Sequence, residues 1–168
     1  SPSRHPRLHV VAEGVDAHEL FEVNVVGKCV GSWPDQGHLS AQHIDELGHV
    51  NNAVWVQWME HLSVSHWRAH APAAEVEASV WMVTRHEIDY RGNVTLGRAV
   101  TGTTWIDEPP RGARFNRRML FRTEDGKTVV EAKTTWAMLD AATHRLLRVP
   151  PHLAEHFMAR AEDYAAAG

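Results

Sequence analysis

One stretch of the sequence decides the fold: His43-Ile44-Asp45-Glu46-Leu47-Gly48-His49-Val50-Asn51-Asn52-Ala53-Val54-Trp55-Val56-Gln57-Trp58-Met59-Glu60. In it, an acid, a glycine, a histidine and two asparagines come directly before a run of apolar residues. Polar segments with glycine are typical of loops, whereas a sustained apolar run is typical of a buried element. The stretch therefore predicts a junction at which a strand ends, a loop carries chemically useful side chains, and a buried helix begins.

We expect that helix to run from Asn52 to about His66. Alanine, valine, tryptophan, methionine and leucine occupy most of its circumference in the first half, and a helix that is apolar on nearly all sides is one that other structure surrounds. Asn51 or Asn52 is suited to the N-cap position, because an asparagine side-chain oxygen accepts hydrogen bonds from amides that the first turn leaves free.

Four strands are expected after the helix, at Val80 to Tyr90, Gly97 to Ile106, Arg114 to Arg122 and Thr128 to Leu139. Each carries β-branched or aromatic residues in partial alternation, and turn-forming residues separate them. The pair Asp125-Gly126 predicts a tight hairpin, because glycine adopts the positive φ that two-residue turns require. We expect the four strands to form an antiparallel meander.

Shorter elements are expected on either side of these. They are a weak strand within Leu20 to Val26, a strand from His38 to Asp45, a short helical turn at Ala73 to Ala78, and an amphipathic helix that opens at Pro150-Pro151 and runs to about Ala166. Proline is tolerated in the first turn of a helix, so it does not argue against the last of these.

The length of 168 residues fits one domain. A long buried helix followed by four strands gives an α+β class, in which the helix lies against a single antiparallel sheet. Such a sheet keeps open edges and one exposed face, which a second copy of the chain is expected to cover. We therefore expect a homodimer, with a dimer of dimers as the larger alternative.

The composition argues against several classes of function. A formal charge of -4 gives no reason to expect nucleic acid as a partner, because nucleic-acid-binding domains show a basic surplus or a basic face. No run approaches the roughly 18 apolar residues that a membrane span requires, so we expect a soluble chain without membrane association. The single cysteine, Cys29, cannot form an internal disulfide, which suits a cytoplasmic location.

Thirteen histidines raise the question of a metal site. The pairs His66 with His70 and His152 with His156 each share a helical face, and the second pair has the H-x-x-E-H pattern of inverted zinc proteases. That protease site needs a further acidic ligand on a second helix of a much larger domain, so we interpret the pattern as coincidence. We expect no bound metal and no cofactor.

The run Asp45 to Ala53, followed by Trp55, Trp58 and Glu60, closely resembles the signature of hot-dog-fold thioesterases of the 4-hydroxybenzoyl-CoA thioesterase and acyl-ACP thioesterase type. The resemblance extends from about Leu39 to Pro151. It implies a hot-dog fold, in which a long central helix is wrapped by an antiparallel β-sheet. It also implies three parts of the chain: an N-terminal extension with an accessory strand (1–36), the hot-dog thioesterase domain (37–151) and a C-terminal helix packed on it (152–168).

The resemblance implies roles for individual residues. Asp45 falls on the family's catalytic carboxylate, and Asn52 on the residue whose backbone N–H, at the helix N-terminus, polarises the thioester carbonyl. His49 matches a histidine that contributes in the acyl-ACP branch. Leu47 stands where that branch commonly has an asparagine, and Trp55 replaces a more usual tyrosine.

These residue types suit thioester hydrolysis, which needs a nucleophile or an activated water at the carbonyl carbon and donors aimed at the developing oxyanion. The free N–H groups and partial positive charge of a helix N-terminus supply those donors, and Gly48 permits a sharp turn before it. Asp45 either attacks the carbonyl to form an anhydride or takes a proton from water. His49 either hydrogen-bonds Asp45 or fills space, and both choices stay open.

Candidates for substrate binding are Gly48, Asn51, Trp55, Glu60, Arg85 and Tyr90. Most of them also have a structural interpretation: a helix cap for Asn51, core packing for Trp55, and a strand face for Arg85 and Tyr90. Glu60 lies about two turns along the helix from Asn52, where a polar side chain can face the pocket or a dimer interface.

The leading interpretation is an enzyme that hydrolyses an acyl-CoA or acyl-carrier-protein thioester. The alternatives are a hot-dog hydratase or dehydratase, and a non-catalytic acyl-binding or regulatory domain on the same scaffold, because a fold alone does not determine chemistry. Arg114, Arg117 and Arg118 could meet the phosphates of coenzyme A or an acidic carrier protein, but we expect them to form a solvated strand face.

Overall fold

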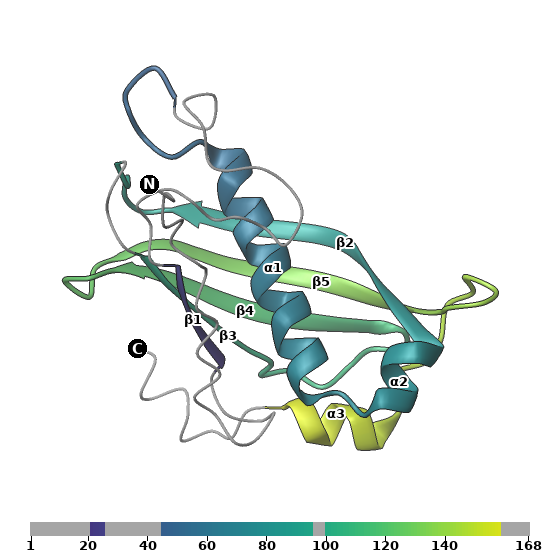
Figure 1. Cartoon of the computed structure of the whole chain (residues 1–168). Helices are drawn as coiled ribbons and strands as arrows, with labels where there is room; N and C mark the ends of the chain where they lie inside the picture. The colour runs from purple at the N-terminus through teal and green to yellow at the C-terminus, as the bar shows by residue number, and fades with distance from the viewer. Residues whose placement is uncertain (1–20, 26–44, 96–99, 159–168) are drawn as a thin grey trace, which may run out of the picture.

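The computed structural model describes residues 21–25, 45–95 and 100–158 (Figure 1). Within these ranges five strands form one sheet, and α1 lies across one face of it (Figure 1), which confirms the α+β class. No helix in these ranges is long and apolar enough to cross a membrane. The elements in chain order are β1 (Phe21–Val25), α1 (Asn52–His70), α2 (Ala73–Ala78), β2 (Ser79–Tyr90), β3 (Val100–Trp105), β4 (Arg114–Thr123), β5 (Thr128–Asp140) and α3 (Pro151–Phe157).

The strand order is β1-β3-β4-β5-β2, and neighbouring strands are antiparallel. The predicted meander is correct for β3, β4 and β5 but wrong for β2, which pairs with β5 instead of β3. At 12 and 13 residues, β2 and β5 are the longest described strands, so their pairing satisfies the most backbone groups. Residues 91–99 join β2 to β3, which lie three strand spacings apart, or about 14 Å. Nine residues can span about 30 Å when extended, so the connection is long enough for this strand order.

Most other predicted elements are confirmed, with bounds that differ by a few residues. Helix α1 extends to His70, one turn beyond the predicted end, and Ala73–Ala78 is helical as expected. The predicted weak strand corresponds to β1, which pairs with β3 at an edge of the sheet. The predicted C-terminal helix ends at Phe157, where Met158 is an extended C-cap, so its expected end near Ala166 is wrong. The residues before Asp45 that were predicted as a strand, and the boundary at residue 36, lie outside the described residues.

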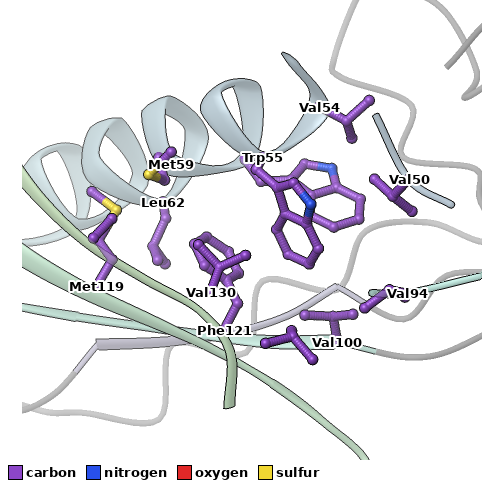
Figure 2. Close-up of a cluster of buried hydrophobic side chains, with 13 residues drawn as sticks. Val50, Val54, Trp55, Met59, Leu62, Val94, Val100, Met119, Phe121 and Val130 are labelled. Atoms are coloured by element: carbon purple, nitrogen blue, oxygen red, sulfur yellow. The ribbon is translucent and has the colours of Figure 1, made fainter. Parts of the chain in front are cut away.

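The core lies between α1 and the sheet. Trp55, Met59 and Leu62 of α1 face Met119 and Phe121 of β4 (Figure 2), and all five side chains are at most 2% exposed. Burial of side chains of this size stabilises a fold by about 1.5–3 kcal/mol each. The sheet covers one side of α1, whereas Ala53, Gln57 and Glu60 on its other side are exposed in the described chain. The prediction of a helix surrounded on nearly all sides therefore holds for one side alone.

Gly102 on β3 allows α1 to approach the sheet closely. A Cβ at this position would lie 2.9 Å from Phe121 Cε1 and 3.2 Å from Leu62 Cδ2. Replacing Gly102 with Ala should therefore lower the free energy of unfolding by about 1–3 kcal/mol, measured by urea denaturation, although alanine is preferred over glycine in uncrowded strands. In a Phe121→Leu background the same change should cost less, because the shorter side chain leaves room. An equal cost in both backgrounds would contradict this packing.

Candidate active site

Asp45 closes the loop that precedes α1. Its Oδ1 accepts hydrogen bonds from the backbone N–H groups of Leu47 (2.9 Å) and His49 (2.8 Å), and its own N–H donates to the His49 carbonyl (2.8 Å). Gly48 has a φ of +76°, a conformation that glycine adopts without strain. One carboxylate oxygen therefore holds the loop in shape, and Oδ2 is left available for chemistry.

His49 lies beside that second oxygen. Its Nδ1 is 4.0 Å from Asp45 Oδ2, and the side chains of His49 and Asp45 are 25% and 40% exposed. The separation is too long for a hydrogen bond but short enough for electrostatic attraction when the imidazole is protonated. His49 also forms a β-bridge with Thr95, and the Val50 N–H donates to the Val94 carbonyl (2.8 Å). The segment after β2 therefore fixes the loop from its other side, a contact that no sequence motif indicated.

Asn51 is the N-cap of α1, which decides between the two predicted caps. Its side-chain Oδ1 accepts from the Ala53 N–H (3.1 Å), and its carbonyl accepts from the Val54 N–H (2.9 Å). The backbone N–H of Asn52 has no acceptor among the described residues, and Asn52 is exposed. Because a helix N-terminus carries partial positive charge, this N–H is a donor presented to a polarised or anionic oxygen.

Replacing Asn51 with Ala should remove the side-chain cap and lower the free energy of unfolding by about 0.5–2 kcal/mol, measured by urea denaturation. A serine at position 51 should retain most of the stability, because its hydroxyl oxygen caps a helix in the same way. Equal stabilities of the alanine and serine variants would show that the hydrogen bond to Ala53 contributes nothing measurable.

Two predicted substrate contacts on α1 lie away from this junction. Trp55 is 2% exposed and packs edge-on against Trp58 and Phe121, with ring centroids 4.9 and 5.3 Å apart. Its side chain is therefore part of the core in this chain. Glu60 is exposed on α1, eight residues beyond Asn52 and so about 12 Å along the helix axis. Gly48 and His49, by contrast, contact Asp45 directly, and Asn51 caps the helix that follows the same loop.

The two predicted contacts on β2 occupy opposite faces of the sheet. Tyr90 is opposite Val130, a core residue beneath α1, and burial raises the pKa of its hydroxyl. Arg85 is the cross-strand partner of Thr135 on β5. The next residue, Trp136, lines a pocket together with residues of α1, so Thr135 lies on the opposite face of the sheet. Cross-strand partners share a face, so Arg85 points away from α1. Within one chain, Arg85 does not reach the Asp45 loop.

The histidine pattern of the last helix is not assembled as a metal site. The described part of the chain contains no group of three or more His, Cys, Asp or Glu residues placed to hold a metal ion. His152 Nε2 lies 3.1 Å from Glu75 Oε1, whereas His156 Nε2 lies 2.8 Å from the His70 carbonyl oxygen. The two histidines therefore contact different elements, and both contacts attach α3 to the helices beside it.

A long helix laid across an antiparallel sheet of this strand order is the arrangement of the hot-dog fold. Residues 39–157 match the family model of the thioesterase-like superfamily, and the chain belongs to that superfamily. The predicted resemblance to hot-dog acyl thioesterases is thereby confirmed.

Solved structures share this fold. A thioesterase from Thermus thermophilus, complexed with coenzyme A and Zn, has a TM-score of 0.59 and 22% identity over 70% of this chain and 85% of that chain. An acyl-ACP thioesterase from Bacteroides thetaiotaomicron has a TM-score of 0.66 and 15% identity over 84% of this chain and 54% of that chain. These identities are low, so the two likenesses establish the fold alone.

A curated relative is similar over a shorter range. It is the chloroplastic acyl-(acyl-carrier-protein) hydrolase FATB3 of Cuphea viscosissima, which is 24% identical over 79 residues. The aligned part covers 47% of this chain but 19% of that protein. This chain therefore spans about one fifth of the length of the curated relative.

Proposed function

We propose that this chain hydrolyses an acyl thioester, carried by coenzyme A or by acyl carrier protein, to a carboxylic acid and a thiol. The observation that carries the proposal is a pair of unused groups at the junction between the Asp45 loop and α1. The backbone N–H of Asn52 has no acceptor among the described residues, and Oδ2 of Asp45 accepts none of the hydrogen bonds that hold the loop. Membership of the thioesterase-like superfamily supports it. Acyl-CoA and acyl-carrier-protein thioesters are the proposed substrates because the solved relatives include a thioesterase with coenzyme A and an acyl-ACP thioesterase.

The carbonyl oxygen of the thioester would accept a hydrogen bond from the Asn52 N–H, where the helix N-terminus stabilises developing negative charge. In one route, Oδ2 of Asp45 attacks the carbonyl carbon, the C–S bond breaks, and water then cleaves the mixed anhydride. In the other route, Asp45 takes a proton from water as the water oxygen adds to the carbonyl carbon, and the C–S bond breaks. In both routes the sulfur leaves as a thiolate, which is protonated by solvent.

A single turnover in isotopically labelled water separates these routes. Label in the Asp45 carboxylate after one turnover would identify nucleophilic attack, because water then opens the anhydride at the protein carbonyl. Label confined to the product acid is the result expected for general-base catalysis, in which the water oxygen adds to the acyl carbon. Mass spectrometry of the peptide that contains Asp45 makes the measurement.

A panel of alkyl and aryl thioesters of coenzyme A and of acyl carrier protein tests the activity, with thiol release as the signal. Hydrolysis of at least one of them is the expected result. Hydration of an enoyl-CoA without thiol release would identify a hydratase or dehydratase instead. Saturable acyl-CoA binding without turnover would identify a non-catalytic acyl-binding domain.

We also propose a homodimer in which β2 pairs with β2 of a second copy. In the described sheet β2 is an edge strand of 12 residues, and an unpaired edge is a template for a further strand. Val80, Met82 and Tyr90 on it are 43%, 49% and 43% exposed. Light scattering should give twice the 18.9 kDa mass of the chain, or four times for a dimer of dimers. The mass of a single chain at micromolar concentration would contradict the dimer.

A further inference from the structure

A pocket lies at the end of α1 opposite the Asp45 loop. The second half of α1, α3 and the strands β2, β4 and β5 enclose it, and its empty volume is about 500 Å³, including space open to solvent. Its α1 residues run from Ser63 to Trp67, which places it about 16–23 Å from Asn52 along the helix axis. Figure 1 shows α3 beneath this end of α1. The pocket is therefore separate from the candidate active site.

Arg117 of β4 lines this pocket as a buried cation. Its side chain is 6% exposed, so the prediction of a solvated strand face is wrong for this residue: its position on β4 faces α1. Its Nη1 lies 2.7 Å from Nδ1 of His66 and donates to Oγ1 of Thr104 (3.0 Å). Because a guanidinium only donates, Nδ1 of His66 is the acceptor and carries no proton. Both partners are therefore uncharged acceptors.

Both hydrogen bonds of the Arg117 guanidinium use Nη1. No further hydrogen bond or ion pair joins Nε or Nη2 of Arg117 to another residue in the described ranges. Burial lowers the pKa of Arg117 to about 9, which still leaves the group charged near neutral pH. A buried charge without a counter-charge is costly, and an anion that enters the pocket would remove that cost.

Aromatic side chains form much of the remaining wall: Trp67, Trp81, Phe115, Trp136 and Phe157. Trp67 stacks on Phe157 with ring centroids 5.4 Å apart and an interplanar angle of 25°, and it meets Trp81 edge-on at 5.4 Å. The Nε1 of Trp81 is buried and has no hydrogen-bond partner among the described residues. The wall therefore combines a large apolar surface with donors, and none of its lining residues carries a carboxylate.

We propose that this pocket binds an aryl or medium-chain monocarboxylate, with the carboxylate against Arg117 and the apolar body against the wall that Trp67, Trp81 and Phe157 form. A planar guanidinium presents pairs of N–H groups that match the two oxygens of a carboxylate. A multiply charged ligand such as a phosphate would lose more hydration in an aromatic pocket than one guanidinium can replace. The site does not depend on thioester hydrolysis, because it lies at the other end of α1.

Isothermal titration of the full chain with two acids, 3-phenylpropionate and octanoate, and with their neutral amides tests the proposal. At least one acid should bind with a Kd below about 1 mM and at least about tenfold more tightly than its amide, because the amide lacks the charge that Arg117 pairs with. This comparison requires no variant. Equal affinities of acid and amide, or no binding of either acid in this range, would overturn the proposal.

Two variants locate the bound carboxylate. Arg117→Met removes the charge but keeps an unbranched side chain of similar length, and it should bind acid and amide alike. Asp45→Asn should bind the acid with the Kd of the parent, because Asp45 lies at the far end of α1. A retained preference for the acid in Arg117→Met, or a changed Kd in Asp45→Asn, would place the carboxylate elsewhere and overturn the proposal.

Discussion

Replacing Asp45 with Asn should lower kcat for acyl-thioester hydrolysis by at least about 100-fold, with a much smaller change in KM. Asparagine keeps an Oδ1 that can accept from the Leu47 and His49 amides, so the loop should keep its shape. The change removes the negative charge and the basicity of Oδ2, which both proposed routes require. Steady-state thiol release under saturating substrate gives kcat, and its dependence on substrate concentration gives KM.

Glu46→Gln is the matched control, because it neutralises the adjacent exposed carboxylate in the same loop. It should hydrolyse thioesters at the rate of the parent. Thermal unfolding of Asp45→Asn should resemble that of Glu46→Gln, which shows that lost activity does not reflect lost folding. If Asp45→Asn were as active as the parent, the proposed catalytic carboxylate would be the wrong residue.

The junction before α1 could be predicted from the sequence because its causes are local. Asp45 bonds to amides two and four residues away, and Asn51 to an amide two residues away. Interactions over such short separations recur wherever the same residue types recur at the same spacing. The apolar residues of α1 likewise predicted a helix packed in the core, and the structure buries one side of it.

Contacts between distant segments could not be predicted in this way. The pairing of β2 with β5 and the bridge between His49 and Thr95 depend on how the chain crosses the sheet. Arg117 belongs to a basic run in the sequence, yet its strand position lies opposite Thr134, which is fully buried. Its burial depends on the tertiary arrangement, because the placement of α1 over β4 decides which face of β4 is enclosed.

The face of Arg85 illustrates a further limit. The pairing of β2 with β5 shifts register between Val83 and Arg85, and a slip of one residue reverses which side chains face the core. Arg85 accordingly lies on the outer face, where it pairs with Glu87 at 2.9 Å. A simple alternation counted along Val80 to Tyr90 assigns one half of the strand to the wrong face.

Replacing Trp55 with Ala should lower the free energy of unfolding by about 3–5 kcal/mol, measured by urea denaturation. The indole is 2% exposed and contacts Trp58 and Phe121 edge-on, so its removal leaves a cavity between α1 and the sheet. Gln57→Ala changes an exposed residue of the same helix and should alter stability by less than about 0.5 kcal/mol. A small loss in Trp55→Ala would show that this part of the core repacks easily.

Trp55→Phe then separates packing from substrate binding. Phenylalanine keeps an aromatic ring in the core, so the variant should fold, and kcat/KM should stay within about threefold of the parent for every acyl group if the ring only packs. Selective loss of activity on long or aryl groups, with stability retained, would show instead that the acyl group reaches the core beside Trp55. The substrate contact that the family resemblance implies at this position would then hold, and α1 would have to separate from the sheet to admit the acyl group.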